Sequence, residues 1–209
     1  MNTITCQFCD ADALRSRNLI LTEDLEHWTI AGKGQLTEGY VLHIPRQHVP
    51  CYGAMNEPEI EKCAHHIQKI RSVLENVYGV NSFVMFEHGV VGQTVKHAHM
   101  HFMPGITNLN QRVWADFPLC SADTISSLVE LPWLYQEKNV PYLLWQDSES
   151  NKIRLLWNPP APAQYFRKIS AEKLGRSEQS DWSSVNPVVD FFAIAQTTKR
   201  LYPHFTHSA

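Results

Sequence analysis

The segment 92–104 reads GQTVKHAHMHFMP, and it places three histidines, His97, His99 and His101, at alternate positions. Alanine, methionine and phenylalanine follow them in turn. Side chains at i, i+2 and i+4 of a β-strand point to one face of the sheet, about 6.6 to 6.8 Å apart. A strand over Val95–Met103 would therefore bury the apolar side chains and present three imidazoles in a row on its other face.

Two simpler interpretations of this histidine segment stay open on the alternation alone. A solvated strand face can carry histidines by chance, although histidine is uncommon and the alternation here is strict. Three histidines from one strand can also converge on a single metal ion. The surrounding sequence is needed to weigh these against a catalytic role.

The first half of the chain predicts an antiparallel α+β unit with a long helix. A helix is expected from Pro58 to Gly79, because apolar residues recur there at steps of three and four. Short β-rich runs that end at turn residues or proline predict strands over Asn18–Leu21, His27–Ala31, Gly39–Pro45 and Ser82–Glu87. We expect these elements and the histidine segment to form one domain over residues 1–110.

The second half has a mixed α/β pattern, and we interpret residues 111–209 as a C-terminal extension. A short helix is expected over Ser121–Val129. Two apolar runs, Tyr142–Gln146 and Lys152–Trp157, flank a polar stretch and predict a hairpin. Helices are expected over Gln164–Leu174 and Val188–Leu201. The pattern does not define the role of this extension or whether it packs on the first domain.

The composition is that of an ordinary globular protein, apart from its eleven histidines. The chain has 209 residues, 44% of them hydrophobic, and a formal net charge of −3. Because no strongly basic run is present, wholesale nucleic-acid binding is not favoured. The chain has five cysteines, no apolar stretch near the ~18 residues of a membrane span, and no signal-like pattern at Met1–Thr5. These features predict a reduced, cytoplasmic protein.

The segment Gly92–Pro104 resembles the signature of the histidine triad superfamily, in which three histidines alternate with apolar residues after Gly-Gln-Ser/Thr. The upstream segment Gly39–His48 (GYVLHIPRQH) is similar to the family's second strand and the Pro-x-x-His that follows it. Together the two matches cover about half of the chain. The resemblance implies an α+β fold and a hydrolase or nucleotidyltransferase activity on a nucleotide or nucleotide conjugate.

The resemblance also implies roles for individual residues. His99, the middle histidine, would attack the α-phosphate, because a neutral imidazole keeps one nitrogen free near neutral pH. The product is a covalent nucleotidyl-histidine, which divides the reaction into two easier steps. His101 would donate hydrogen bonds to the phosphate or the leaving group, and Gln93 would contact the phosphate. Backbone amides near Gly92 and Thr94 would assist.

The stretch before the histidines departs from the family pattern. Glu87 stands where many relatives have asparagine, and the spacing from there to Gly92 is short. The run Phe86–Gly89, the long second half and the Gln164–Arg167 sequence are more similar to relatives with appended regions, including some linked to RNA-lariat processing. Alternative functions are therefore a nucleotide-binding regulatory module with little turnover and an RNA-processing-related factor.

Cys6 and Cys9 form a Cys-x-x-Cys sequence, a spacing common in structural zinc sites, although free thiols also fit it. Many bacterial relatives, and the related galactose-1-phosphate uridylyltransferases, complete a tetrahedral site with two histidines. Those positions correspond here to His48 and His97, so the resemblance implies a Cys₂His₂ zinc site, with His88 as a substitute ligand. It also implies a homodimer formed by the long helices.

The remaining side chains that bear on a site are expected to be ordinary. These include four histidines, which we expect to be surface or satisfied core residues: His27, His43, His65 and His66. Strand alternation allows His43 to border the nucleoside pocket. Arg167 and Lys168 could reach a phosphate, but we expect them on a solvated helix face.

Overall fold

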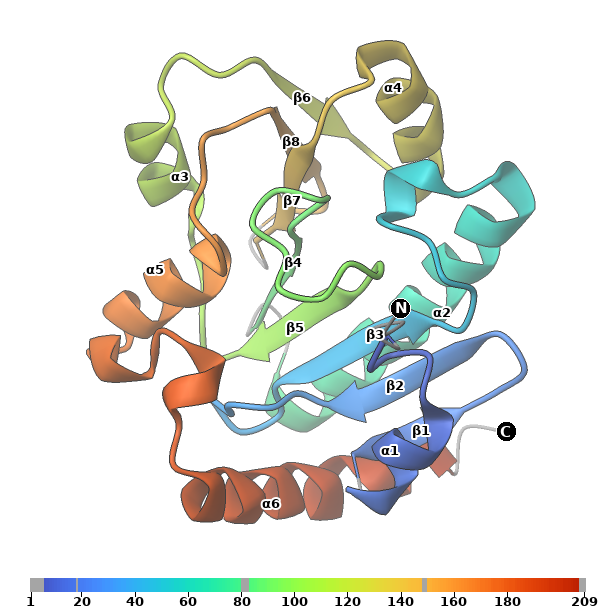
Figure 1. The fold of residues 1–209 in the computed structure, drawn as a ribbon, viewed down its shortest axis with the longest axis vertical. Coiled ribbons are helices and arrows are strands. Elements are labelled where there is room, and N and C mark those ends of the chain that lie inside the picture. Colours follow the sequence, from blue (N-terminus) through green and yellow to red (C-terminus); the bar gives the residue numbers. More distant parts are fainter. Residues whose placement is uncertain (1–5, 18, 80–82, 148–149, 207–209) are drawn as a thin grey trace, which may run out of the picture.

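The computed structural model describes residues 6–17, 19–79, 83–147 and 150–206. They contain an eight-stranded sheet with the order β1-β2-β3-β5-β4-β7-β8-β6, in which neighbouring strands pair antiparallel (Figure 1). The strands are β1 (Ile20–Glu23), β2 (His27–Ala31), β3 (Val41–Pro45), β4 (Phe83–Glu87), β5 (Met100–Pro104), β6 (Ala122–Ile125), β7 (Tyr142–Gln146) and β8 (Ile153–Trp157).

Helices cover both faces of this sheet and its β1 edge (Figure 1). The α-helices are α1 (Ala11–Ser16), α2 (Glu57–Tyr78), α3 (Asn110–Asp116), α4 (Leu131–Lys138), α5 (Tyr165–Lys173) and α6 (Pro187–Thr206). The short 3₁₀ helices are η1 (Tyr52–Ala54), η2 (Leu128–Glu130), η3 (Ser177–Gln179) and η4 (Trp182–Ser184). The predicted α+β fold, with an antiparallel sheet, a long helix and a mixed extension, is confirmed.

The long helix α2 has the boundaries that its sequence signals require. The Asn56 side chain accepts the Glu59 N–H, and the Glu59 carboxylate accepts the Asn56 N–H, both at 3.0 Å. This reciprocal capping box satisfies two backbone donors that the first turn leaves unpaired. At the other end Gly79 adopts φ +96°, which a residue with a Cβ atom rarely does, and the helix stops. The predicted helix is therefore confirmed, beginning one residue earlier than Pro58.

The strand that carries the histidine segment is shorter than predicted. β5 begins at Met100, so of the three histidines His101 alone lies in a strand. The β3 ladder ends at the His43–Met100 pair, and the preceding Ala98 N–H instead donates to the Val49 carbonyl at 2.7 Å. The apolar half of the prediction is confirmed, since the side chains between and after the histidines are fully buried: Ala98, Met100 and Phe102.

The second half of the chain continues the sheet of the first. β7 pairs with β4, joining Met85 to Gln146 and Glu87 to Leu144, and β8 forms the predicted hairpin with β7. The predicted helix over Ser121–Val129 is wrong. Its first part is β6, which pairs with β8, and its last residues begin η2, which Ser127 caps. The division of the chain at residue 110 stays a prediction.

Some sequence expectations fall outside the described residues, namely those on Met1–Thr5 and on the first residues of two predicted strands, Asn18 and Ser82. Within the described ranges, no helix is both long enough and apolar enough to span a bilayer.

The sheet separates two apolar layers. On one side α2 packs against residues such as Val41, Met100 and Phe102. On the other side α1, α3 and α5 pack against residues such as Leu42 and Phe86. Because adjacent strand residues point to opposite faces, each strand contributes to both layers. The candidate sites described below lie in different layers.

The extension also holds the loop between β2 and β3. The Gly39 N–H donates to Thr197 Oγ1 and the Gln35 N–H donates to Asp190 Oδ1, both at 2.9 Å and both from α6. Arg167 of α5 donates to the Gly34 carbonyl at 2.7 Å. The extension therefore packs on the first half and fixes a loop that borders the candidate active site.

Glu87, the residue that departs from the family pattern, is a fully buried carboxyl at the end of β4. Its Oε1 accepts the Tyr52 N–H at 3.0 Å and its Oε2 accepts the Tyr142 hydroxyl at 2.5 Å. Burial raises the pKa of Glu87 to about 8, although both hydrogen bonds oppose the rise. The side chain thus joins η1, β4 and β7 and does not line the candidate active site.

This raised pKa predicts a pH-dependent stability that Glu87→Gln removes. In the unfolded chain a glutamate ionises near pH ~4.3, whereas the folded protein keeps the proton to about pH 8. The stability contributed by the protonated form is therefore present below the unfolded pKa and lost as pH rises towards 8. Between pH 5 and pH 8 the free energy of unfolding of wild type should fall by on the order of a few kcal/mol relative to that of Glu87→Gln, as measured by urea unfolding. The exposed Glu61→Gln is the control, and parallel pH profiles for wild type and Glu87→Gln would contradict this account.

Candidate active site

His99 lies immediately before β5 and is 6% exposed. Its Nδ1 lies 2.6 Å from the His97 carbonyl oxygen. A carbonyl can only accept, so Nδ1 carries the proton and Nε2 keeps a lone pair. Burial lowers the pKa of His99 to about 4, so the imidazole is neutral at pH 7. His99 therefore has the protonation state and the tautomer that a nucleophile requires.

His101 is fixed beside it by aromatic and polar contacts. The Tyr40 hydroxyl lies 2.7 Å from His101 Nδ1, and the Phe86 ring stacks on the imidazole at 4.5 Å between centroids. Among the described residues His101 Nε2 is buried without a hydrogen-bond partner. The centroids of His99 and His101 lie 4.7 Å apart. A ligand group in contact with His99 would therefore also lie close to the unpaired Nε2 of His101.

Both histidines line a cavity with an apolar side and a cationic side. The apolar lining comes from the N-terminal segment, β2 and β3: Phe8, Leu14, Leu19, Ile30 and Leu42. The cations are Arg17, Lys33 and Arg167. Such a cavity suits a ligand with a flat apolar group and a negative charge.

The loop predicted to contact substrate reaches the same cavity, since Gly92, Gln93 and Thr94 all line it. Gly92 has φ +68°, and a Cβ there would lie 2.6 Å from the Pro162 carbonyl oxygen. The Gln93 amide donates to the Pro50 carbonyl at 3.0 Å. The five predicted catalytic and substrate-binding residues are thus brought together, and their roles stay predictions.

Sequence reasoning missed the residues that the extension contributes. Arg167 is 4% exposed and lines the cavity, so the expected solvated position is wrong for it. Its guanidinium donates to the carbonyls of Gly34 and Gln179, which do not neutralise its charge, and its Nε has no partner among the described residues. No local signal in the sequence indicates this position, because the carbonyls that hold Arg167 belong to residues outside its own helix.

His88 is a second residue with a missed position. It lines the cavity, and its ring meets His101 edge to face at 5.6 Å between centroids. The Phe166 N–H donates to His88 Nε2 at 3.3 Å, so α5 orients this imidazole. His88 is therefore placed beside the catalytic candidates and not as a substitute ligand for Cys6 and Cys9.

The four predicted metal ligands form a cluster next to this cavity. One donor atom from each of Cys6, Cys9, His48 and His97 lies within 4.8 Å of the others. Cys6 Sγ lies 3.4 Å from His97 Nδ1, and Cys9 Sγ lies 3.3 Å from His48 Nδ1. His97 Nε2 donates to the Pro45 carbonyl at 2.7 Å, which leaves the Nδ1 lone pair facing the thiols. The cluster has the donor set and orientation of a metal site.

The cluster and the cavity share a loop. Phe8 lies between the two cysteines, and its ring packs edge-on against His99 at 5.1 Å and against His97 at 6.0 Å. Burial and the neighbouring Cys6 raise the pKa of Cys9 to about 11, so a cation is needed to hold the Cys9 sulfur as a thiolate. A metal ion here would fix the position of Phe8 and hence one wall of the cavity.

Residues 23–108 match the HIT domain model. HIT stands for histidine triad, and the matched segment contains β2 to β5 with both His99 and His101. The match supports the HIT superfamily for this part of the chain.

Known proteins resemble the chain at low identity. A HIT family hydrolase from Clostridium thermocellum is 25% identical, with 50% of this chain and 94% of that chain covered and a TM-score of 0.41. A member of the HIT family from Bacillus subtilis is 24% identical, with coverages of 48% and 72% and a TM-score of 0.43. Zinc finger CCCH domain-containing protein 64 of Arabidopsis thaliana is 25% identical over 192 residues, which are 85% of this chain. This chain spans 31% of that relative's length.

The buried charge of Arg167 predicts that anionic ligands bind through the extension. Arg167→Met should weaken AMP binding at least tenfold, about 1.4 kcal/mol, since hydrogen bonds to charged groups are among the stronger ones. Arg167→Lys should keep part of the affinity. Isothermal titration calorimetry measures the change, with Lys168→Met as the control because that neighbour does not line the cavity. Equal affinities for Arg167→Met and Lys168→Met would exclude a ligand role.

Proposed function

We propose that this chain is an enzyme of the histidine triad type that hydrolyses nucleotide conjugates or transfers their nucleotidyl group. The observation that carries the proposal is the hydrogen bond from His99 Nδ1 to the His97 carbonyl at 2.6 Å. It leaves the Nε2 lone pair of a neutral imidazole in a cavity lined by three cations. The match to the HIT domain supports the same reaction class.

In the first proposed step His99 Nε2 attacks the α-phosphorus of the substrate. A nitrogen–phosphorus bond forms, and the bond from phosphorus to the leaving group breaks with its electron pair going to that group. We assign the Tyr40 hydroxyl as donor to His101 Nδ1, so that His101 Nε2–H donates a hydrogen bond to the phosphate or the leaving group and keeps its proton. The leaving group takes its proton from solvent. Gln93 and the backbone near Gly92 and Thr94 orient the phosphate.

In the second proposed step an acceptor attacks the same phosphorus and breaks the bond to His99. Water as acceptor gives a nucleoside monophosphate and makes the enzyme a hydrolase. Phosphate or a sugar phosphate as acceptor makes it a phosphorylase or transferase. In both cases His99 recovers its lone pair, and the acceptor's proton passes to the surrounding base or solvent.

We also propose that Cys6, Cys9, His48 and His97 hold a structural zinc ion. Four protein donors would fill a tetrahedral site, which leaves no position for substrate. The relevant effect on the reaction is positional, through Phe8 and the His97 carbonyl that orients His99. Thiolate ligands require reduced cysteines, so we propose a reducing compartment such as the cytoplasm.

Two other functions make different experimental predictions. A nucleotide-binding module would bind nucleotides tightly and turn over none of a panel of adenylates, dinucleoside polyphosphates and nucleotide sugars. An RNA-processing-related factor is suggested by the long second half of the chain and its Gln164–Arg167 sequence. Such a factor would bind RNA with an affinity that falls steeply as the salt concentration rises.

The central prediction is a covalent intermediate on His99. Rapid mixing of enzyme with a labelled adenylate should give one nucleotidyl group per active chain, detected as an acid-labile mass increase of the intact protein. His99→Ala should remove this adduct and lower turnover by at least about a thousandfold, since the nucleophile is lost. The exposed His65→Ala is the matched control. Full turnover by His99→Ala would overturn the proposed mechanism.

The zinc prediction is independent of turnover. Replacing both Cys6 and Cys9 with serine should lower the zinc content by one ion per chain and lower the unfolding temperature, because the N-terminal loop loses its anchor. Elemental analysis and differential scanning calorimetry measure the two effects. Cys120→Ser, which changes a cysteine outside the cluster, should behave as wild type. An unchanged zinc content in the double variant would refute this site.

A further inference from the structure

Three histidines outside the candidate active site converge between the sheet and α2. His27 begins β2, His43 lies in the middle of β3, and His66 lies in α2. One ring nitrogen of each lies within 4.8 Å of those of the other two. This cluster occupies the sheet face opposite the cavity, because Leu42 lines the cavity and the adjacent His43 points the other way. The expectation that His43 borders the nucleoside pocket is therefore wrong.

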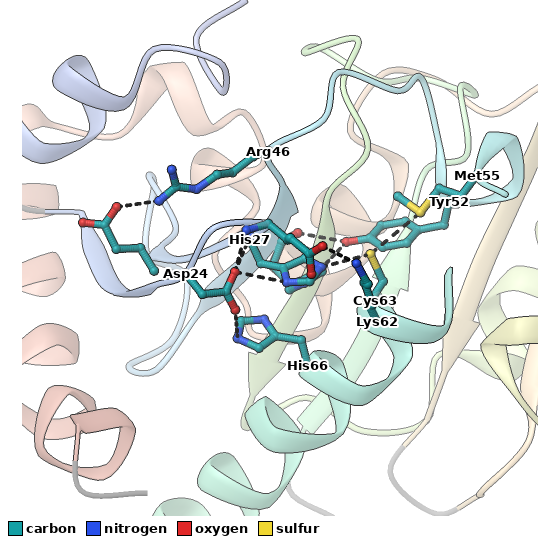
Figure 2. Close-up of polar contacts among 11 residues, drawn as sticks. Asp24, His27, Arg46, Tyr52, Met55, Lys62, Cys63 and His66 are labelled. Atoms are coloured by element: carbon teal, nitrogen blue, oxygen red, sulfur yellow. Dashed lines mark hydrogen bonds and ion pairs between the residues drawn. The ribbon is translucent and has the colours of Figure 1, made fainter. Parts of the chain in front are cut away.

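The strand register and the helix together produce this convergence. His43 pairs with Thr29, and His27 lies two residues from Thr29 on the same face of β2, so His27 and His43 are diagonal neighbours. On α2, Cys63 and His66 are three residues apart and share one helix face. Figure 2 shows His27 of the sheet meeting Cys63 and His66 of the helix.

The hydrogen bonds of Tyr52 determine which nitrogen of His43 is free. The Tyr52 hydroxyl has a single proton, and it donates this proton to the His43 carbonyl oxygen at 3.1 Å. The contact of 2.6 Å between the same hydroxyl and His43 Nδ1 must therefore be donated by Nδ1. His43 Nε2 consequently holds a lone pair, and it is buried with no hydrogen-bond partner among the described residues.

The carboxylate of Asp24 lies beside the outer nitrogens of the other two imidazoles, so that their second nitrogens face the centre of the cluster. Asp24 Oδ1 lies 3.4 Å from His27 Nδ1, and Asp24 Oδ2 lies 3.7 Å from His66 Nε2 (Figure 2). The inward nitrogens are then His27 Nε2 and His66 Nδ1, and the latter is also buried without a partner in the described part of the chain. In metal sites, the ring nitrogen of a histidine that does not bind the metal usually donates a hydrogen bond to an oxygen atom.

We infer that His27, His43 and His66 form a second metal site, which binds a late first-row divalent ion such as zinc. Three neutral imidazoles with outer oxygen partners and inward lone pairs are the donor set that such ions prefer. In a tetrahedral zinc site with bonds of about 2.0 to 2.1 Å, ligand nitrogens lie roughly 3.3 Å apart. The ring nitrogens, which lie within 4.8 Å of one another, must therefore approach by up to about 1.5 Å on binding.

A sulfur donor and an entry route accompany the three imidazoles. Cys63 Sγ lies 3.6 Å from His27 Nε2 and 3.8 Å from Met55 Sδ, and soft ligands of this kind favour zinc and copper over magnesium or calcium. A surface groove reaches the cluster, since His27, Met55 and Cys63 line it together with two carboxylates at Glu26 and Glu59. A cation can enter through this groove.

The site would join α2 to two strands, β2 and β3, that are already paired by backbone hydrogen bonds. His27 and His43 come from neighbouring strands and His66 comes from the helix that covers them, so a bound ion cross-links β2, β3 and α2. The ion would lie on the opposite sheet face from His99, and its function is structural. Its binding therefore stabilises the fold without taking part in the proposed reaction.

The test counts metal ions on untagged protein that is stripped with a chelator, reloaded with Zn²⁺ alone and desalted. Wild type should retain two zinc ions per chain, and Cys6→Ser/Cys9→Ser should retain one. Adding His66→Asn to that double variant should remove the last ion. His65→Asn in the same background should keep it, because His65 is an exposed neighbour on the same helix.

A second measurement separates loss of metal from loss of fold. In the Cys6→Ser/Cys9→Ser background, Zn²⁺ should raise the unfolding temperature by several degrees, and Co²⁺ should give visible ligand-field bands. His66→Asn should abolish both effects while its circular dichroism stays that of the folded protein. A folded double variant that binds no zinc, or equal zinc contents in the His65→Asn and His66→Asn variants, would overturn the inference. Neither result depends on catalytic turnover.

Discussion

The hydrogen bond between His99 and the His97 carbonyl is the interaction on which the candidate active site depends. At 2.6 Å it fixes the tautomer of His99 and leaves the Nε2 lone pair available. The carbonyl belongs to a residue whose own side chain is held on two sides, by the Pro45 carbonyl and by the two thiols. The orientation of the proposed nucleophile is therefore set by the same residue that anchors the N-terminal loop. A change in the Cys₂His₂ cluster would reach His99 through one peptide unit and through Phe8.

The extension is part of this arrangement because it shares both the sheet and the cavity. β7 pairs with β4, which places Trp145 and the α5 residue Phe166 in the same apolar layer as Phe86, the ring that stacks on His101. α5 then supplies Arg167 to the cavity and a backbone donor to His88. Removing the extension would expose one edge of β4 and take a buried cation from the site. The second half thus contributes to the geometry of the first half's histidines.

Patterns that are local in sequence predicted the fold well, and features that depend on distant partners were missed. The capping residues of α2 and the β7–β8 hairpin are local signals, and both are confirmed. The strand boundary at Met100 depends on where β3 stops pairing, which the alternation of histidines does not contain. The conformation of β6 depends on its pairing with β8, which lies later in the chain. The local sequence does not contain this pairing, so the prediction of a helix was wrong. Arg167 donates to Gly34, 133 residues away, so its burial has no local signal.

Three buried histidines, His43, His97 and His99, show how neighbouring oxygen atoms determine which nitrogen of an imidazole is free. A buried imidazole is neutral because burial disfavours its charged form, and it then has one donor and one acceptor nitrogen. For His97 the Pro45 carbonyl takes the donor and leaves Nδ1 free, whereas for His99 the His97 carbonyl leaves Nε2 free. For His43 the Tyr52 hydroxyl has the same effect, on the other face of the sheet. The backbone and tyrosine oxygens therefore determine which nitrogen is free, and the direction in which that nitrogen points distinguishes the proposed nucleophile from the proposed metal ligands.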